Sequence, residues 1–277
     1  MILCYHCVTP RPDLISADPW KMFLEAELFD AQLNYLQKNY NVISLQEYLK
    51  ARRKNRPLPP YSVVLTFDDG KRNFLTVISP YLSKRDLPAT TFVVVGNTEK
   101  AFFVNGSANP GGWKPEDDHD DLSWQDIGRL LKEQKVTVGS HSYTHPNLSG
   151  ICFEEAHDEL QISYQNIVAK TKCKDVAIAY PHGQASDEVI KIAEEVGYSC
   201  GLTNMDAGND FETNLFKLNR TVINSDDAVP LFAARVAGIT WRLGKIKDYL
   251  RPLKNKTKLS SEEKLKLSQN FIKNILF

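Results

Sequence analysis

Two short motifs contain the residue types that can hold a metal ion. The first is Thr66-Phe67-Asp68-Asp69-Gly70, and the second, about seventy residues further along, is His141-Ser142-Tyr143-Thr144-His145. Two imidazoles and one carboxylate form a ligand set typical of zinc, with cobalt or nickel as alternatives, and they leave positions open for water and substrate. Together the motifs predict a site for one divalent metal ion, with zinc as the first choice.

The adjacent carboxylates suggest a division of roles. Neighbouring side chains in an extended chain face opposite ways, so only one of Asp68 and Asp69 is expected to bind the ion. The ion would activate water against an acyl carbonyl while the free carboxylate takes the proton, which is amide or ester hydrolysis. Taken alone, Asp-Asp-Gly after a strand is commonly a turn, and a His pair four residues apart is commonly a solvated surface. The combination of the two motifs favours a catalytic site.

The residues before each motif explain how the two motifs could meet. Residues 62–67 and 136–140 are short, apolar and rich in β-branched side chains, which predicts two buried strands. Both motifs then follow the carboxyl ends of strands, where the active sites of α/β barrels lie. His145 would share an ion with His141 if the residues between them turn helically.

Strand-like and helix-like stretches alternate along the whole chain, as expected of a parallel sheet wrapped by helices. The sequence predicts strands near 2–6, 62–67, 90–95, 136–140, 175–180, 199–203 and 217–222, and helices near 22–38, 71–85, 123–134, 153–171, 185–196 and 226–236. Seven strands with chemistry at one rim predict an α/β fold, a distorted, incomplete (β/α)7 barrel. We expect a catalytic domain over residues 1–240 and a basic amphipathic helical tail over 241–277.

Residues 101–121 are rich in Gly, Pro, Asn and Asp and are predicted to form a long loop. At the catalytic rim this loop would wall a substrate groove, with Phe102, Phe103 and Trp113 as candidate contacts to sugar rings. A flexible acidic loop without contact to substrate is the alternative.

The motifs resemble those of the polysaccharide deacetylases of carbohydrate esterase family four. Further similar segments are Tyr5-His6, Pro80-Tyr81-Leu82, Pro88-Ala89-Thr90-Thr91-Phe92, Leu122-Ser123-Trp124 and Ala179-Tyr180-Pro181-His182-Gly183, so the resemblance covers about residues 1–225. The resemblance implies that Asp68 is the general base and that Asp69, His141 and His145 bind the metal. It also implies that the backbone N–H of His182 donates to the oxyanion.

Two positions depart from the family pattern. The third motif usually begins with an Arg that orients the base, and here that residue is Ala179. Arg220, on a later strand-like stretch, is the candidate replacement, with an ordinary surface or salt-bridging role as the alternative. The usual general acid is a His in a late motif, but the chain has no His after His182.

His6 is the first candidate for the missing acid, because the predicted strand before it would bring it to the same rim. Its Tyr-His motif resembles that of the branch of the family that deacetylates exopolysaccharides. His182 is the rival candidate. A hydrogen-bonded His6 in the core is the alternative without a catalytic role.

Composition limits the partners and the location. The chain has 34 Lys and Arg and 34 Asp and Glu, and this balance disfavours nucleic acid. Residues 241–277 hold ten Lys or Arg and three Asp or Glu, so this tail could lie on an anionic membrane or simply pack on the domain. The start of the chain does not resemble a secretory signal, and the five Cys have no paired spacing beyond Cys4 and Cys7, so we expect a cytoplasmic protein with reduced thiols. Cys4 is expected to be a packing residue.

The sequence therefore predicts a metal-dependent hydrolase that removes N-acetyl groups from an amino sugar of a surface polysaccharide or its precursor. An N-acetylated saccharide is the expected partner. An O-acetyl esterase is the first alternative, since the same attack cleaves both bonds. A carbohydrate-binding relative without activity is the second, and Ala179 keeps it open.

Overall fold

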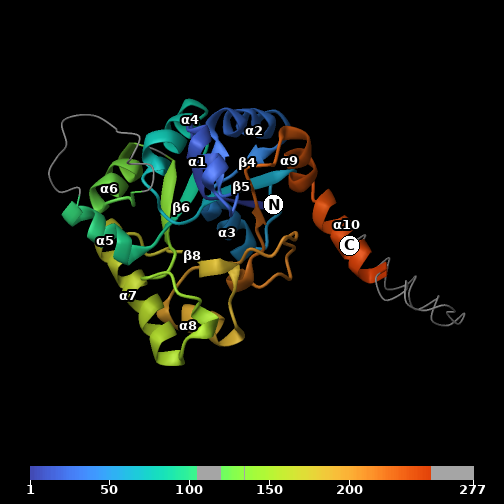
Figure 1. Cartoon of the computed structure of the whole chain (residues 1–277). Coiled ribbons are helices and arrows are strands. Elements are labelled where there is room, and N and C mark those ends of the chain that lie inside the picture. The colour runs from blue at the N-terminus through green and yellow to red at the C-terminus, as the bar shows by residue number, and fades with distance from the viewer. Residues whose placement is uncertain (105–119, 134, 251–277) are drawn as a thin grey trace, which may run out of the picture.

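Figure 1 shows a computed structural model of the chain, which describes residues 1–104, 120–133 and 135–250. Within these residues one eight-stranded sheet forms the centre, in the order β10-β1-β5-β6-β7-β8-β9, with β4 beside β5. All of these neighbouring strands run parallel. The strands are β1 (Ile2–Tyr5), β4 (Asn41–Val42), β5 (Ser62–Phe67), β6 (Ala89–Val93), β7 (Val136–Ser140), β8 (Ile178–Ala179), β9 (Gly201–Leu202) and β10 (Thr221–Val222).

The segment around β10 joins the two edges of the sheet. Thr221 pairs with Leu3 of β1, while Leu218 bridges to Leu202 of β9. The sheet therefore curls round on itself, and residues 218–222 span the gap between its two edges. The predicted distorted (β/α)7 barrel is confirmed, because each of the seven predicted strands overlaps one of the seven strands on this path.

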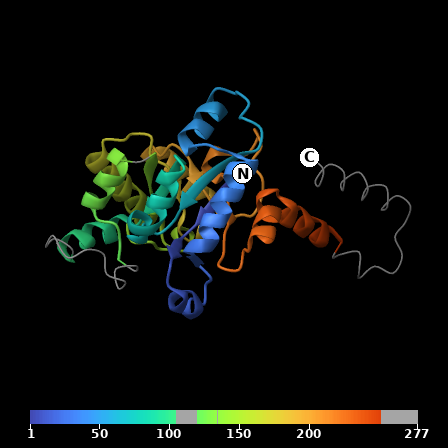
Figure 2. The same ribbon diagram turned by 90° about the horizontal axis from the view of Figure 1, so that it is seen from above.

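Helices cover the outside of the barrel (Figures 1 and 2). Six predicted helical regions are present, as α2 (Ala26–Asn39), the π-helix η1 (Phe74–Ile78) running into α4 (Ser79–Lys84), α6 (Trp124–Glu133), α7 (Phe153–Thr171), α8 (Asp187–Val196) and α9 (Val229–Val236). Both views show α10 (Ile239–Leu250) extending away from the barrel. Among the described residues, no helix combines the length and the apolar character needed to cross a membrane.

Alternation along the strands separates two cores. Leu3, Tyr5 and the odd-numbered residues of β5 pack against the outer helices, whereas Ile2 and Val64 belong to the core inside the barrel. The same period of two directs Thr66 and Asp68 inward beyond Val64, and Cys4 and His6 inward beyond Ile2. The inner face thus changes from apolar at one end of the barrel to polar and ionisable at the other.

Several elements differ from the sequence predictions. Residues 22–25 were expected to be helical, but β3 (Phe23–Glu25) pairs with β2 (Cys7–Thr9) in a second, two-stranded sheet that also holds α1 (Pro12–Ala17) close by. Helix α3 (Leu45–Arg53) was not predicted, although Ser44 and Glu47 form the capping box that begins it. Helix α5 (Val95–Val104) corrects the prediction of a loop from residue 101, since residues 101–104 are helical.

Parts of three predictions lie outside the described residues. These are the remainder of the predicted loop with Trp113, the side chains of Phe102 and Phe103, and the tail beyond residue 250. The predicted domain boundary at residue 240 lies within α10.

Candidate active site

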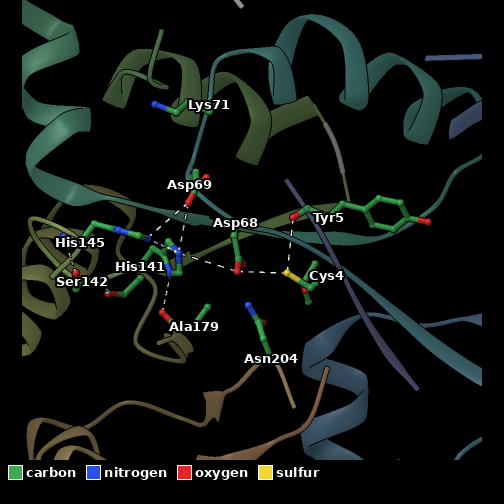
Figure 3. A network of polar contacts seen from close by, with 12 residues as sticks. Cys4, Tyr5, Asp68, Asp69, Lys71, His141, Ser142, His145, Ala179 and Asn204 are labelled. Carbon is green, nitrogen blue, oxygen red and sulfur yellow. Dashed lines mark hydrogen bonds and ion pairs between the residues drawn. The ribbon is translucent and has the colours of Figure 1, made fainter. Parts of the chain in front are cut away.

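Asp69, His141 and His145 converge at the carboxyl ends of β5 and β7 (Figure 3). The Nε2 atoms of His141 and His145 are 3.2 Å apart, and they lie 3.5 and 3.8 Å from Oδ1 of Asp69. Tetrahedral bonds of about 2.0–2.1 Å would separate two ligand atoms by about 3.3 Å. The three side chains therefore fit a single zinc-sized ion.

Hydrogen bonds fix which nitrogen of His141 faces this point. Its Nδ1 lies 2.7 Å from the carbonyl oxygen of Ala179, which leaves Nε2 directed at Asp69 and His145. Burial, together with the charge of His141, lowers the pKa of His145 to about 4, so this ring is neutral near pH 7 and offers a lone pair. Burial opposes protonation of His141, but Asp68 and Asp69 raise its pKa, so a metal ion would compete with a proton at this ring.

The backbone around the first motif explains the Asp-Asp-Gly sequence. Asp69 has φ 72°, and this left-handed residue turns the chain sharply after β5, so that Asp68 and Asp69 diverge. Gly70 has φ +63°, and a Cβ atom there would lie 2.8 Å from the Cα of Val93 on β6. Only glycine fits this position without displacing the neighbouring strand.

The second motif is a turn rather than a helix, contrary to the helical spacing that would have brought its two histidines together. Ser142 and His145 both have left-handed backbone, with φ 63° and 67°. The Ser142 hydroxyl accepts a hydrogen bond of 2.9 Å from the backbone N–H of His145. This turn brings the second imidazole back over the first.

Arg220 holds Asp68 from across the barrel. Its Nη1 and Nη2 donate to Oδ1 and Oδ2 of Asp68, each at 2.7 Å, in the paired geometry of a bidentate ion pair. Arg220 is fully buried and Asp68 is 2% exposed. Burial alone would raise the pKa of Asp68, but the charges of Arg220 and His141 outweigh it and lower the pKa to about 2. Asp68 is thus an ionised carboxylate, and its Oδ2 lies 4.0 Å from Nε2 of His141.

The remaining donors of Arg220 are also occupied. Nε donates to the carbonyl of Thr203 at 3.0 Å, Nη1 reaches the Thr66 hydroxyl at 3.3 Å, and Nη2 donates to Oδ1 of Asn204 at 2.7 Å. The guanidinium also lies 5.7 Å over the ring of Phe92. Arg220 is therefore locked in one orientation, and the surface role considered for it is wrong.

Cys4 and His6 are close neighbours of Asp68. Donor atoms of Cys4, His6 and Asp68 all lie within 4.8 Å of one another, and the Cys4 thiol contacts Oδ2 of Asp68 at 3.3 Å. Nδ1 of His6 is buried and has no hydrogen-bond partner among the described residues. The alternative that His6 is a hydrogen-bonded core residue therefore finds no support at this nitrogen. Cys4, expected only to pack, is thus a neighbour of the candidate base.

This second cluster is a poorer metal site than the first. Both oxygens of Asp68 already accept from Arg220, and burial raises the pKa of the Cys4 thiol well above its usual value, so the thiol keeps its proton. Asp69, His141 and His145 are therefore the better candidates for metal ligands.

His182 lies on the outer side of the ligand group. Its ring centroid is 4.9 Å from that of His145, and the residue is exposed, whereas His6 is 8% exposed. His182 has φ 59° within the short 3-10 turn η4 (Pro181–Gly183), and Gly183 next to it fits closely against Asn204. The two candidate acids therefore differ in their neighbours and exposure, since the buried His6 lies beside Asp68 and the exposed His182 beside His145.

Two further residues near the site carried no signal in the sequence. Asn204 accepts from Arg220, and Glu159 of α7 accepts from the backbone of the second motif. Each sits in a stretch without motif-like spacing, where Asn and Glu are ordinary loop and helix-surface residues.

Comparison with known proteins agrees with this geometry. The family model of polysaccharide deacetylases matches residues 55–201. The poly-β-1,6-N-acetyl-D-glucosamine N-deacetylase of Escherichia coli K12 is 23% identical over 252 residues, which is 80% of this chain and 36% of that protein, so the chain spans about a third of its length. The enzyme of the same name from Staphylococcus aureus MRSA252 is 24% identical over 209 residues, which is 72% of this chain and 67% of that protein.

Solved structures share the fold. The Streptococcus pyogenes deacetylase PplD, solved in complex with acetate, aligns with a TM-score of 0.73 and 25% identity, covering 85% of this chain and 96% of that chain. IcaB from Ammonifex degensii aligns with a TM-score of 0.68 and 20% identity over the same shares of the two chains. With both motifs assembled at one rim and the family model covering more than half of the sequence, the chain belongs to the polysaccharide deacetylase family.

Proposed function

We propose that this protein is a metal-dependent hydrolase that removes N-acetyl groups from the amino sugars of a surface polysaccharide or its precursor. The observation that supports this most strongly is the ligand group Asp69, His141 and His145 beside an ionised Asp68. Relatives from two bacteria are named poly-β-1,6-N-acetyl-D-glucosamine N-deacetylases, so oligomers of this sugar are the first substrates to test.

The metal ligands are Asp69, His141 and His145, and zinc is the proposed ion, with cobalt or nickel as alternatives. When bound, the ion supplies the Lewis acidity that polarises an acyl carbonyl and makes water a better nucleophile at neutral pH. The side chains of Asp69 and His145 are 26% and 31% exposed, so substrate can approach from this side.

Asp68 is proposed as the general base. Its ion pair with Arg220 keeps it charged and fixes its direction. Oδ2 accepts from both Arg220 and the Cys4 thiol, whereas Oδ1 accepts only from Arg220 among the described residues and retains a lone pair. Asp68 can then take a proton from water attacking the acetyl carbon. Arg220 is the positioning residue in this proposal, taking the place of the motif Arg that is replaced by Ala179.

His6 is proposed as the general acid. An amine leaves only when protonated, and His6 is a buried imidazole beside Asp68 whose Nδ1 has no hydrogen-bond partner among the described residues. The exposed His182 is the alternative, and its backbone N–H is proposed as a donor to the oxyanion.

Acetate release from a panel of N- and O-acetylated saccharides, with and without a chelator, tests the function. We expect chelator-sensitive release from N-acetylglucosamine oligomers. Release from O-acetyl substrates alone would instead establish the esterase alternative. Saccharide binding without any release would establish the non-catalytic alternative, which Arg220 makes less attractive because it supplies the guanidinium that Ala179 lacks.

A cytoplasmic location, with peripheral contact of the basic tail with the membrane, is also proposed. All five cysteines are free thiols, which fits the reducing cytoplasm predicted above. Contact of the basic tail with anionic membranes is tested by sedimentation with vesicles that contain phosphatidylserine, and binding that disappears at high salt is the expected result.

A further inference from the structure

The turn that carries both histidine ligands has an unfavourable backbone. Ser142 and His145 are non-glycine residues with φ 63° and 67°. Such left-handed conformations cost free energy and persist only where the surroundings enforce them. Both imidazoles depend on this turn, so whatever enforces it also determines how well the metal ligands are preorganised.

One side of the turn is held by α5. The backbone N–H of Val95 donates to the carbonyl of Ser142 at 3.2 Å, and that of Gly96 donates to the carbonyl of Tyr143 at 2.8 Å. These bonds satisfy the carbonyl groups of Ser142 and Tyr143. The N–H groups of Tyr143 and Thr144 are instead bonded from the side of α7.

The other side is held by a single carboxylate, that of Glu159 on α7. The successive backbone N–H groups of Tyr143 and Thr144 both donate to Oε2 of Glu159 at 2.8 Å, and the Thr144 hydroxyl donates to Oε1 at 2.5 Å. Successive N–H groups next to a left-handed residue form a concave anion site, and here a side chain of the same protein fills it.

The helix that carries Glu159 is anchored to the strand that carries His141. The hydroxyls of Ser163 on α7 and Ser140 on β7 are 2.6 Å apart. The Tyr198 hydroxyl donates to the carbonyl of Leu160 at 2.9 Å and lies 3.0 Å from the Ser140 hydroxyl, from which it can accept. Glu159 is thus one turn away from a fixed point, and its carboxylate can transmit that rigidity to the turn.

We infer that Glu159 is a positioning residue that sets the affinity of the metal site by holding the turn between His141 and His145. This inference rests on the proposed metal site. Without the carboxylate, the two N–H groups and the Thr144 hydroxyl turn to water, and metal binding must then order the turn as well as form its bonds. Polar groups that orient metal ligands in this way typically change metal affinity by about 10- to 100-fold when removed.

Neighbouring carboxylates provide matched controls. Glu159 lines an open groove of about 360 Å³ together with Glu155 and Asp158 of the same helix. The Asp158 side chain is 71% exposed, and its contact is with His157 rather than with the turn. Asp158→Ala removes the same charge from the same groove and leaves the hydrogen bonds of the turn intact.

The test is the zinc affinity of the full chain, measured by competition with a chromogenic chelator. We expect Glu159→Ala to bind zinc about 10- to 100-fold more weakly, and Asp158→Ala to bind it as the wild type does. Glu159→Gln should recover most of the loss, because its amide oxygen can accept both N–H groups while its NH₂ donates to the Thr144 hydroxyl. Thr144→Val, which removes one of the three bonds, should weaken binding less than Glu159→Ala.

Wild-type zinc affinity in Glu159→Ala would overturn the inference. An equal loss of zinc affinity in Asp158→Ala would also overturn it, because the loss would then come from the negative charge of the groove and not from the hydrogen bonds of the turn. A lower melting temperature of the metal-free protein with unchanged zinc affinity would show a merely structural role. If Glu159→Ala does not fold, wild-type affinity in Thr144→Val overturns it instead. Because affinity is read without substrate, a wild-type protein that binds no zinc refutes the metal site and thereby the proposed function, not the role of Glu159 alone.

Discussion

The two halves of the site are held in different ways. Asp68 is buried and is fixed by side chains distant in sequence, above all by Arg220, which lies 152 residues away. The His141–His145 turn is partly exposed and is fixed mainly through its own backbone, by α5 and by Glu159 only 15 or 16 residues away.

This difference matches the separate demands on the two halves. A carboxylate that must stay ionised away from water needs a compensating charge, and Arg220 provides it. The proposed metal ligands need access for a substrate, and they are held instead by a hydrogen-bonded turn. Substitutions in one half should therefore abolish metal binding, and substitutions in the other should leave metal in place and abolish proton transfer.

The largest effect is expected for the ligands. Replacing Asp69, His141 or His145 by Ala leaves two protein ligands, too few for a stable open site. Each variant should lose both bound metal and turnover, as measured by elemental analysis after dialysis and by acetate release. Stoichiometric metal in all three variants would show that the ion is bound elsewhere.

Asp68→Asn should separate the two halves. Asparagine is nearly isosteric but cannot accept a proton from water, so turnover should fall by ~10² to 10⁴ while one metal ion stays bound. Acetate release and metal content are measured on the same sample, at a temperature where circular dichroism shows it folded. Turnover at the wild-type level would remove Asp68 from the mechanism.

Arg220→Met should affect stability as well as activity, because it leaves the buried charge of Asp68 without a partner. Breaking a buried ion pair from one side costs about 3–5 kcal/mol of unfolding free energy. The double variant Arg220→Met with Asp68→Asn has no unpaired charge and should regain part of this loss. Urea unfolding of the four metal-free proteins measures the coupling, and additive losses would mean that the ion pair contributes nothing.

The smallest and most selective effect is expected for His6→Ala. An alkoxide leaves more easily than an amine anion, so loss of the acid should depress N-deacetylation by about 10²-fold while an activated aryl acetate is largely spared. His182→Ala should be milder on the same pair of substrates. The reverse order would transfer the acid role to His182.

The sequence predicted the barrel because its strands are apolar and rich in β-branched residues and its helices are amphipathic. Both patterns can be recognised within short stretches of sequence. It missed β2, β3 and β4, which have only two or three residues each. The strands β8, β9 and β10 are equally short, but each lies within a longer strand-like stretch, at residues 175–180, 199–203 and 217–222. Helix α3 was missed although its capping box, Ser44 and Glu47, was readable.

Within the site, the two motifs were predictable because each lies within five consecutive residues. The ion pair of Arg220 with Asp68 was left open, since it depends on residues 218–222 joining β9 to β1 at the two edges of the sheet. The role inferred for Glu159 needed the structure, because it depends on the direction of two backbone N–H groups.

Anomalous diffraction at the zinc edge, from crystals of the zinc-loaded protein, would locate the ion most directly. We expect one peak, with Asp69, Nε2 of His141 and Nε2 of His145 at about 2.0–2.2 Å, and with Asp68 still paired to Arg220. A peak bonded to Cys4, His6 and Asp68, or the absence of any peak between the two histidines, would contradict the proposal that Asp69, His141 and His145 bind the metal while Asp68 acts as the base.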